Sequence, residues 1–494
     1  MGQVLAESQE RLVEVEATGR ERPEPAPVGE QKTFRSYDPE QVLLMAPVLS
    51  EWVPEGDLAH FVSDLVDTSL ALSEIYASYE SERGYPPYDP RLMLKLVIYG
   101  YANGICSSRK LEQATHRDVA VRMLCAGQHP DYRSIARFRA RHLDALSELF
   151  VQALRLCAEA GLVKLGRLAL DGTKLRANAS RHKAMSYERM TKKETELEAE
   201  IAELRARARA LLAEAAATDA AEDERFGLDN RGDELPDELA RRESRLARLR
   251  EAKAALEAEA REREERRRAE MAAEGRTPRT PLSGRDPFVP KPSDQRNFTD
   301  PESKIMKASD GAFHQSYNGQ AVVDSEAQVI VAAELSNLAP DTPQLQGALD
   351  QLDENLAEIE AELPEGAALT ADAGYFSEEN VVTTEAHGLD PHIATGRHKH
   401  SDPPPVAPRG PIPADATPKQ RMARKLKTKR GRTVYARRKT IVEPVFGQMQ
   451  TVQSARQLLL RGEAAARAQW RFHCAVHNLL KLHRAGGTTL LTTG

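Results

Sequence analysis

Three acidic residues stand where their side chains could act together. Asp171 ends the apolar run that begins at Arg167, Asp372 ends a second apolar run, and a glycine follows each aspartate within two residues. Glu443 lies among apolar residues directly after the most basic run of the chain. Carboxylate oxygens are the ligands that hard divalent cations prefer, and two such cations can catalyse displacement at a phosphate. The three residues therefore indicate metal-dependent chemistry on a phosphate-containing substrate.

Each of these carboxylates also has a simpler explanation. An aspartate that precedes a glycine turn is often a turn former or a helix cap. Glu443, taken alone, fits a partly buried residue that pairs with Arg437 or Arg438. A carboxylate beside apolar surface is unfavourable unless it is paired or binds a metal, so we expect Glu443 to point inward or into a cleft. The combination of two strand ends and one helix favours a shared metal site over three separate structural roles.

The residues around Glu443 predict an amphipathic helix. Val442, Val445 and Met449 recur at spacings of three and four, which is the period of a helix with one apolar face. Pro444 directly follows Glu443, and proline is tolerated in the first turn of a helix but not in its interior. We therefore expect this helix to begin close to Glu443 or to be kinked there.

The two aspartates require strands that end at one rim of a sheet. An aspartate at a strand end, before a glycine, projects from the rim where α/β proteins place their sites. Between the two aspartates, the runs 317–323 and 328–335 predict an antiparallel hairpin. The sequence thus predicts a mixed sheet flanked by helices. The elements expected after the hairpin are a helix from Thr342-Pro343, the strand that ends at Asp372, a helix from about Ser377 and a strand over 392–395.

A long helical insertion separates the first strand from the hairpin. Between about Met185 and Met271 the chain is rich in Ala, Glu, Arg and Leu, with apolar residues at alternating spacings of four and three. The stretch 222–236, which contains two glycines and a proline, divides the insertion, and Arg242 and Lys253 interrupt the apolar seam of its second half. Each seam is narrow and must be buried, so we favour an antiparallel helical hairpin over a coiled coil between chains. A spacer, a dimer contact and a guide for DNA ends are all compatible with this pattern.

The N-terminal part of the chain, from Asp38 to Leu162, follows an almost wholly helical pattern. Asp89-Pro90 predicts the start of a helix that stops at Gly104, and a later helix is expected to run from near Tyr132 through Phe150. Short helices with tight turns and clustered arginines suggest a DNA-binding region of the helix-turn-helix kind. A plain helical bundle with a solvated arginine face fits the same pattern. The arginines concerned are Arg133, Arg137, Arg139 and Arg141.

The run from Arg421 to Lys439 is about half lysine and arginine and contains no acidic residue. Basic runs are often solvated, disordered tails. This run lies inside the chain and next to a candidate metal ligand, which favours contact with a phosphate backbone. We expect DNA contacts from Arg424, Lys425, Lys427, Lys429, Arg430, Arg432, Tyr435, Arg437, Arg438 and Arg461.

The composition limits the class of protein. With 494 residues and a formal net charge of −6, the chain is long enough for several domains and is not a uniformly basic DNA-coating protein. Its four cysteines lack paired spacing, which favours reduced thiols over a zinc site or disulfides. No apolar run is long enough to span a membrane and no signal peptide is evident, so a soluble intracellular protein is expected. His398, His400 and Asp402 lie in a proline-rich stretch that favours a flexible loop over a metal site.

Four motifs occur in order along the chain. They are Leu168-Ala-Leu-Asp171-Gly-Thr, Tyr317-Asn-Gly-Gln-Ala-Val-Val-Asp, Ala371-Asp372-Ala-Gly-Tyr-Phe-Ser and Ile441-Val-Glu443-Pro-Val-Phe-Gly. Together they resemble the DDE-type transposases of bacterial insertion sequences, and Tyr435 and Arg438 precede the glutamate much as in the Tyr-Arg-Glu signature of that family. The resemblance runs from about Phe34 to about Arg484. Many relatives carry a lysine seven residues after the glutamate. Here that position is Gln450, and Arg456 or Arg461 is the candidate substitute for its contact with the transposon end.

The resemblance implies an α+β multidomain protein with a helical domain that binds transposon ends and a ribonuclease-H-like domain that cuts and joins DNA. It implies that Asp171, Asp372 and Glu443 hold two Mg²⁺ ions, for which Mn²⁺ can substitute, with Asp171 as the shared ligand. The implied partners are double-stranded DNA, both as terminal inverted repeats and as target, and a second protomer in a homodimer on DNA. A cytoplasmic, nucleoid-associated bacterial protein with no membrane partner is expected.

Two alternatives to this function stay open, namely a catalytically inactive or repurposed DNA-binding protein and a metal-dependent nuclease without strand transfer. A pre-cut 3′-hydroxyl end separates the nuclease from a transposase, because only a transposase joins that end to another duplex. In either case the chain is expected to divide into a disordered tail (1–33), a helical DNA-binding domain (34–163), a catalytic domain in two parts (164–184 and 301–485), the inserted hairpin (185–274), a proline-rich linker (275–300) and a C-terminal tail (486–494).

Overall fold

The computed structural model describes residues 48–79, 87–180, 183–226, 237–273, 275–277, 286–308, 311–396, 409–413 and 415–486. For 207–226 and 237–241 it describes the backbone alone. The predictions of a disordered tail over 1–33 and of a flexible loop at His398, His400 and Asp402 lie outside the described residues, as does most of the C-terminal tail.

Helices make up the N-terminal part of the described chain. The helix predicted to start at Asp89-Pro90 is present. The Asp89 side chain accepts a hydrogen bond from the backbone N–H of Arg91, and Pro90 occupies the first turn; both features stabilise the start of a helix. Gly104 follows the end of this helix with a positive φ of 72°, a conformation that glycine adopts without strain. The elements are η1 (Leu49–Trp52), α1 (Leu58–Thr68), α2 (Ser73–Ala77), α3 (Pro90–Ala102), α4 (Ser108–Arg117), α5 (Val119–Leu124), α6 (Tyr132–Arg141) and α7 (Leu143–Glu159).

The single helix expected from Tyr132 through Phe150 is two helices. His142 lies between α6 and α7 with a non-helical backbone conformation, and its ring is buried. The ring packs 4.7 Å from Phe138 and 5.7 Å from Tyr79, measured between ring centroids. The prediction was wrong here because tertiary packing of His142, rather than a glycine or proline, ends the helix.

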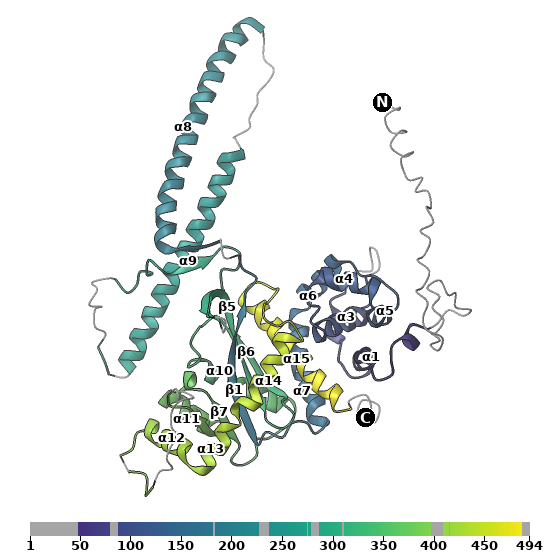
Figure 1. Ribbon diagram of the computed structural model, residues 1–494. Helices are drawn as coiled ribbons and strands as arrows, with labels where there is room; N and C mark the ends of the chain where they lie inside the picture. The colour runs from purple at the N-terminus through teal and green to yellow at the C-terminus, as the bar shows by residue number, and fades with distance from the viewer. Residues whose placement is uncertain are drawn as a thin grey trace, which may run out of the picture. The chain divides into compact units, whose positions relative to one another are not determined.

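A mixed sheet forms the centre of the remaining chain (Figure 1). Strand β1 (Arg167–Arg176) pairs antiparallel with β5 (Phe313–Asp324) on one side and parallel with β7 (Ala368–Ala371) on the other. The predicted hairpin is confirmed, because β5 pairs antiparallel with the strand that follows it. The other strands of this sheet are β4 (Lys304–Lys307) and β6 (Ile330–Ser336), both beside β5, and β8 (Asp390–Ile393), parallel to β7.

Strand β1 does not end at Asp171 as predicted but continues to Arg176. Strand β5 pairs with β1 as far as Arg176, whereas the pairing with β7 stops at Leu170 opposite Ala371. Gly172, which suggested a turn, is instead a place of close approach, because a Cβ there would lie 2.6 Å from the side-chain nitrogen of Gln320. Asp171 therefore lies inside a strand, at the point where one of its two neighbouring strands ends.

Helices follow the strands and cover the sheet. Asp372, directly after β7, accepts a hydrogen bond from the N–H of Gly374 and so caps a short turn of 3₁₀ helix. Ser377 caps the next helix in the same way, as the sequence predicts. The elements are α10 (Gln344–Glu358), η3 (Ala373–Tyr375), α11 (Glu378–Ala386), α12 (Pro418–Lys427), α13 (Lys429–Ala436), α14 (Arg438–Thr451) and α15 (Glu463–Arg484).

Helix α14 begins at Arg438, five residues before Glu443, so the first of the two expectations, a helix that begins close to Glu443, was wrong. The second, a kink at this point, stays a prediction. Pro444 lies inside the helix and cannot donate a hydrogen bond to the carbonyl of Thr440, one turn earlier. The side-chain amide of Gln328 donates to that carbonyl at 3.0 Å instead. A residue distant in the sequence therefore offsets the main penalty of an interior proline.

One hydrophobic core links the N-terminal helices, the sheet and α15. The buried helix α15 contributes Trp470, whose indole N–H donates to the carbonyl of Gln320 in β5 at 3.0 Å. Its Phe472 ring packs edge-on against Tyr101 of α3, with centroids 4.8 Å apart. The four cysteines are buried and form no disulfide, as predicted. Helix α15 thus connects the region of short helices to the sheet.

Two long helices, α8 (Tyr187–Phe226) and α9 (Asp237–Ala273), lie side by side between two short strands (Figure 1). These strands, β2 (Ala184–Ser186) and β3 (Gln295–Asn297), pair antiparallel and form a second, small sheet. Met190, Leu197, Ile201, Leu246, Leu249 and Leu256 form a separate apolar cluster between the helices. Lys253, which interrupts the predicted apolar seam, forms a salt bridge with Glu194 of α8 at 2.8 Å.

Candidate active site

Asp171 and Asp372 occupy neighbouring positions of the sheet. The parallel register pairs Leu170 with Ala371, and the two aspartates are the next residues of the two chains. Since side chains alternate between the two faces of a sheet, residues that follow a parallel pair project to the same face. The charge on Asp372 contributes to raising the pKa of Asp171, which agrees with this proximity. The structure thus brings two of the three predicted carboxylates together.

Arg438 is the direct partner of Asp171. Its guanidinium donates to the carboxylate at 2.7 Å, and both side chains are mostly buried, with 10% and 22% exposed. Burial raises the pKa of Asp171, and the positive charge of Arg438 opposes that rise only in part. Arg438, which the sequence suggested as a DNA contact or as a partner of Glu443, instead neutralises Asp171 in this structure.

Glu443 lies on α14 and its side chain is exposed, which contradicts the expectation that it points inward. It forms no salt bridge with any described residue. Within the described ranges, no three His, Cys, Asp or Glu side chains come close enough together to hold one metal ion. The third carboxylate is therefore not gathered with the two aspartates in this structure.

Gln450 fastens α14 to the strand that carries Asp171. Its side-chain amide donates to the hydroxyl of Thr173 in β1 at 2.9 Å. Gln450 lies seven residues, or about two helical turns, after Glu443, so the two side chains leave α14 on nearly the same face. The residue that departs from the family pattern thus has a structural role that connects α14 with β1.

Asp341, which the sequence analysis did not single out, belongs to the same region. It lies between β6 and α10, and its carboxylate accepts hydrogen bonds from Lys174 and from Asn318, each at 2.9 Å. The Lys174 side chain belongs to β1, three residues after Asp171. Polar residues such as Asn318 and Gln320 inside an otherwise apolar strand were the signal in the sequence, because buried polar groups require partners.

The Asp341 network also touches the turn that carries Asp372. The hydroxyl of Tyr375 donates to the side-chain carbonyl of Gln320, whose amide nitrogen lies 3.4 Å from Asp341. A Cβ on Gly374 would lie 3.0 Å from the Asp372 carboxylate and 3.4 Å from that of Asp341, so glycine allows both acids to approach this turn. Burial, followed by the charges of the nearby aspartates, raises the pKa of Tyr375 and keeps its hydroxyl neutral.

Arg139, predicted to contact DNA, is buried in the helical region. Its guanidinium donates to the carbonyl of Cys106 at 2.6 Å and to the hydroxyls of Tyr101 and Ser108. These contacts join α6 to the end of α3 and the start of α4. Arg139 is therefore a structural residue and is not available to a DNA backbone, which corrects the prediction.

Most of the other predicted DNA contacts have exposed side chains, and some of these also bond within the fold, as Arg141 does to the carbonyl of Ser78 and Arg461 to that of Asn178. Lys425 donates to the carboxylate of Asp390 and to the carbonyl of Pro391, and Arg424 donates to the carbonyls of Arg409 and Gly410. These two side chains hold the basic segment against the rest of the fold. Tyr435 is half-buried, and burial raises its pKa. The exposed members are Arg133, Arg137, Arg141, Lys427, Lys429, Arg430, Arg432, Arg437 and Arg461.

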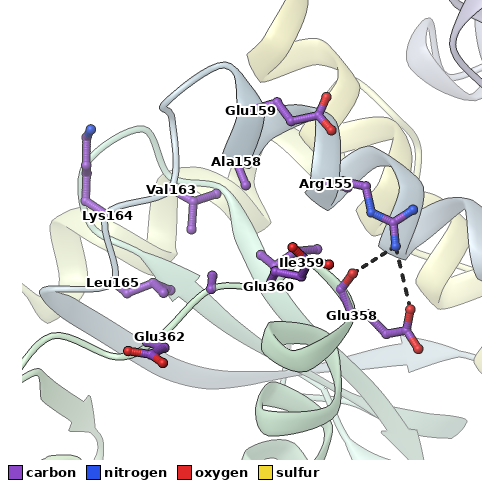
Figure 2. A pocket seen from close by; sticks show the side chains of 11 residues that line it. Arg155, Ala158, Glu159, Val163, Lys164, Leu165, Glu358, Ile359, Glu360 and Glu362 are labelled. Atoms are coloured by element: carbon purple, nitrogen blue, oxygen red, sulfur yellow. Dashed lines mark hydrogen bonds and ion pairs between the residues drawn. The ribbon is translucent and has the colours of Figure 1, made fainter.

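The larger of two pockets described does not contain the aspartates. It has a volume of about 680 Å³ and lies between the end of α7, the end of α10 and the residues that lead into β1. Figure 2 shows Arg155 bonded to Glu358 at its rim, and three further glutamates line it, namely Glu159, Glu360 and Glu362. Such a concentration of carboxylates repels phosphate. The candidate site is therefore the face of the sheet beneath α14.

Comparison with known protein families matches both ends of the described chain. Residues 47–141, the N-terminal helices, match a transposase domain (DUF772), and residues 412–483, which include α12 to α15, match a transposase DDE domain. The second match contains Arg438, Glu443 and Gln450, whereas Asp171 and Asp372 lie outside both matches. No curated protein and no solved structure matches the chain. Among the described helices, none is long and apolar enough to cross a membrane.

Proposed function

Because this chain belongs to the DDE-type transposases of insertion sequences, we propose that it cuts and joins DNA through Asp171, Asp372 and Glu443. The observation that carries this proposal is the adjacency of Asp171 and Asp372 at the point where β7 ends beside β1. Helix α14 is linked to this strand by Arg438 and Gln450, and Glu443 lies on α14 between these two contacts. Double-stranded DNA is the substrate, and we propose that two protomers act together on it.

The order of the strands supports a ribonuclease-H-like catalytic domain. Three strands connected by antiparallel pairing, β1, β5 and β6, are followed by two parallel strands, β7 and β8. In such an arrangement the central strand β1 presents its residues beside the end of β7, where the two aspartates meet. We propose that α8 and α9 are an insertion into this domain after its first strand, since they leave and rejoin it through the paired strands β2 and β3.

Two of the three proposed ligands, Asp171 and Asp372, fit a divalent metal as they lie in this structure. Asp171 and Asp372 offer hard oxygen donors on one face, and Arg438 supplies the positive charge that the buried Asp171 requires when no cation is bound. Asp171, Asp372 and Glu443 would hold two Mg²⁺ ions, or Mn²⁺ in their place. Such ions, when bound, favour attack by water or by a DNA 3′-hydroxyl and stabilise the leaving oxygen.

The side chains around Asp171 have different roles in this proposal. Arg438 would compete with a cation for the carboxylate of Asp171, and a guanidinium displaced from that carboxylate would be available to a DNA phosphate. Gln450 holds α14 against β1 through Thr173 and so limits where Glu443 can lie. Lys174 and Asp341 fix the opposite face of the same strand.

Substitution of Asp171 tests the proposed chemistry. Asp171→Ala removes a ligand but few phosphate contacts, and phosphate contacts supply most of the affinity for DNA. We expect this variant to retain a gel shift with DNA that carries the terminal repeats and to lose nicking in the presence of Mg²⁺. Asp353→Asn is the matched control, because Asp353 is a surface partner of His387 away from the site. Cleavage by Asp171→Ala at the rate of the unmodified protein contradicts the assignment.

The exposure of Glu443 and the glutamine at position 450 favour a second candidate, a DNA-binding protein without catalysis. A strand-transfer assay with a pre-cut 3′-hydroxyl end decides between the candidates. Joining of that end to a second duplex supports a transposase. Nicking without joining indicates a nuclease, and binding without either reaction indicates the non-catalytic candidate.

A further inference from the structure

A second pocket lies beneath the basic helices. It has a volume of about 620 Å³ and is bounded by the first residues of β1 and β7 on one side and by α13 and the start of α14 on the other. Four of its lining residues are cationic and none is acidic. We call this the basic pocket; its cations are Arg167, Lys429, Arg430 and Arg437.

Three of the four cations of the basic pocket have no salt-bridge partner among the described residues, and the fourth has only a distant one. Within the described part of the chain, Arg167, Lys429 and Arg437 form no salt bridge, and Arg430 reaches only Asp390 at 4.0 Å with a side chain that is 77% exposed. Four like charges around one concavity repel each other and concentrate positive potential. An anion that enters the pocket relieves this repulsion. Arginine presents a planar set of donors that matches phosphate.

The basic pocket and Asp171 lie on the same face of the sheet. Arg167 and Asp171 are four residues apart on β1, and side chains at even spacing along a strand project to the same face. Arg437 lines the pocket, while the next residue, Arg438, bonds to Asp171. At about 3.3 Å per strand residue, the pocket lies about 13 Å from Asp171 along β1.

We propose that the basic pocket binds the phosphodiester backbone of the DNA whose cleavage was assigned above to Asp171, and the inference rests on that function. Where the DNA axis runs along β1, an axial rise of about 3.4 Å per nucleotide makes about 13 Å equal to about four base pairs. The pocket then holds the backbone about four base pairs along the axis from the phosphate that is cut. Arg167 becomes a DNA contact that the sequence pattern did not indicate.

Salt dependence of DNA binding tests the basic pocket. The probe is a fluorescent duplex of arbitrary sequence, because phosphate contacts do not depend on sequence. Arg437→Ala and Lys429→Ala should each weaken binding about 5–10-fold at 0.1 M salt and reduce the slope of log affinity against log salt by about 0.9 per lost contact. Lys419→Ala is the control: it removes an exposed lysine of α12 that does not line the pocket, and should keep the slope of the unmodified protein.

Replacement of single DNA phosphates by neutral methylphosphonates tests where along the DNA the basic pocket binds. The probe is a duplex that ends in the terminal repeat. With the unmodified protein, neutralising the phosphate about four base pairs from the cut should weaken binding, and Arg437→Ala should show no further loss at that phosphate. Equal losses in the unmodified protein and in Arg437→Ala at every phosphate would overturn the inference.

The basic pocket and the proposed active site can each be disproved without the other. If the unmodified protein cuts DNA but Arg437→Ala and Lys429→Ala keep its affinity and salt slope, the basic pocket is wrong and the active site stands. If these variants lose affinity as expected but the unmodified protein cuts no DNA, the pocket stands and the catalytic proposal falls. Unchanged thermal unfolding in both variants, expected because both side chains are exposed, excludes misfolding as the cause.

Discussion

Asp171 and Arg438 form a largely buried ion pair at the point where β7 ends beside β1. A buried charge without a partner is strongly unfavourable, so Arg438 stabilises the site in the absence of a cation. The same guanidinium competes with any cation for the carboxylate of Asp171. The pair therefore connects the stability of the fold with the binding of the proposed metal.

Arg438→Gln separates these two effects. Without a cation, the variant should lose about 1–3 kcal/mol of unfolding free energy, because the carboxylate of Asp171 loses its main counter-charge while solvent still reaches it in part. Addition of Mg²⁺ should raise the melting temperature of the variant more than that of the unmodified protein, since the competitor has been removed. Equal Mg²⁺-induced shifts in the two proteins, measured by differential scanning fluorimetry, would contradict this account of the pair.

Two buried histidines of α15 predict a pH dependence of stability. Burial lowers the pKa of His473 to about 3 and that of His477 to about 4, and neither ring nitrogen of His473 has a hydrogen-bond partner among the described residues. An unfolded histidine titrates near 6.5. Below that pH the unfolded chain therefore binds protons that the folded chain does not, and stability must fall as the pH decreases from about 6.5 toward 4.

Urea unfolding between pH 7.5 and 5 measures this effect. Each histidine should contribute a slope of up to about 1.4 kcal/mol per pH unit at the acidic end of this range. His473→Leu should flatten the profile, because the unfolded variant no longer binds the proton that the buried ring excludes. A profile that His473→Leu does not alter would rule out this histidine as the cause.

Helix α14 is the element on which the proposed site depends most. It contacts β1 at Asp171 through Arg438 and at Thr173 through Gln450, and Glu443 lies between these two anchors. A helix held at both ends to one strand offers its intervening residues a restricted set of positions. The position of Glu443 relative to the aspartates therefore depends on both contacts.

A double-mutant cycle tests the Gln450 anchor. Gln450→Ala and Thr173→Val should each cost about 1 kcal/mol, the usual value of a side-chain hydrogen bond, and the double variant should cost no more than either single one. Both should lower kcat for DNA cleavage more than they raise KM, because they displace Glu443 and not the basic pocket. Strictly additive losses would show that the hydrogen bond does not couple α14 to β1.

Prediction from the sequence succeeded for helices and strands that have a strong local pattern. It failed where the residues that determine the structure are far apart in the sequence. The helix at Asp89-Pro90 and the hairpin were predicted because capping residues and period-two alternation are local signals. The start of α14 was missed, since Arg437 offers no capping side chain and the donor that compensates Pro444, Gln328, lies over a hundred residues earlier. Gly172 suggested a turn, but it lies inside a strand, where the side chain of Gln320 leaves no room for a Cβ.

The candidate site was predicted in part for the same reason. The motifs singled out Asp171 and Asp372, and the register of β1 and β7 places these two residues directly after a paired position. They did not reveal Asp341, whose role arises from contacts with Asn318 and Lys174 across the sheet. The arginine pattern did not distinguish the buried Arg139 from its exposed neighbours, because a helical period alone does not show which face another helix covers.

The two faces of the central sheet carry different sets of charged and polar side chains. Asp171, Thr173 and the basic pocket share the face that α14 crosses. The other face carries the network of Lys174 and Asp341. The net charge of −6 conceals this arrangement, since cations gather locally near the carboxylates while acidic residues predominate elsewhere. A polyanion such as DNA responds to the local field and not to the overall charge.

The proposed chemistry requires that Asp171, Asp372 and Glu443 form one metal-binding set. Its most direct test is Mn²⁺ binding, measured by electron paramagnetic resonance in the presence of DNA, for Asp171→Asn, Asp372→Asn and Glu443→Gln, with Asp353→Asn as control. Each of the three substitutions should lower the number or the affinity of bound Mn²⁺ ions, whereas the control should bind as the unmodified protein does. Unchanged Mn²⁺ binding by Glu443→Gln would contradict this requirement.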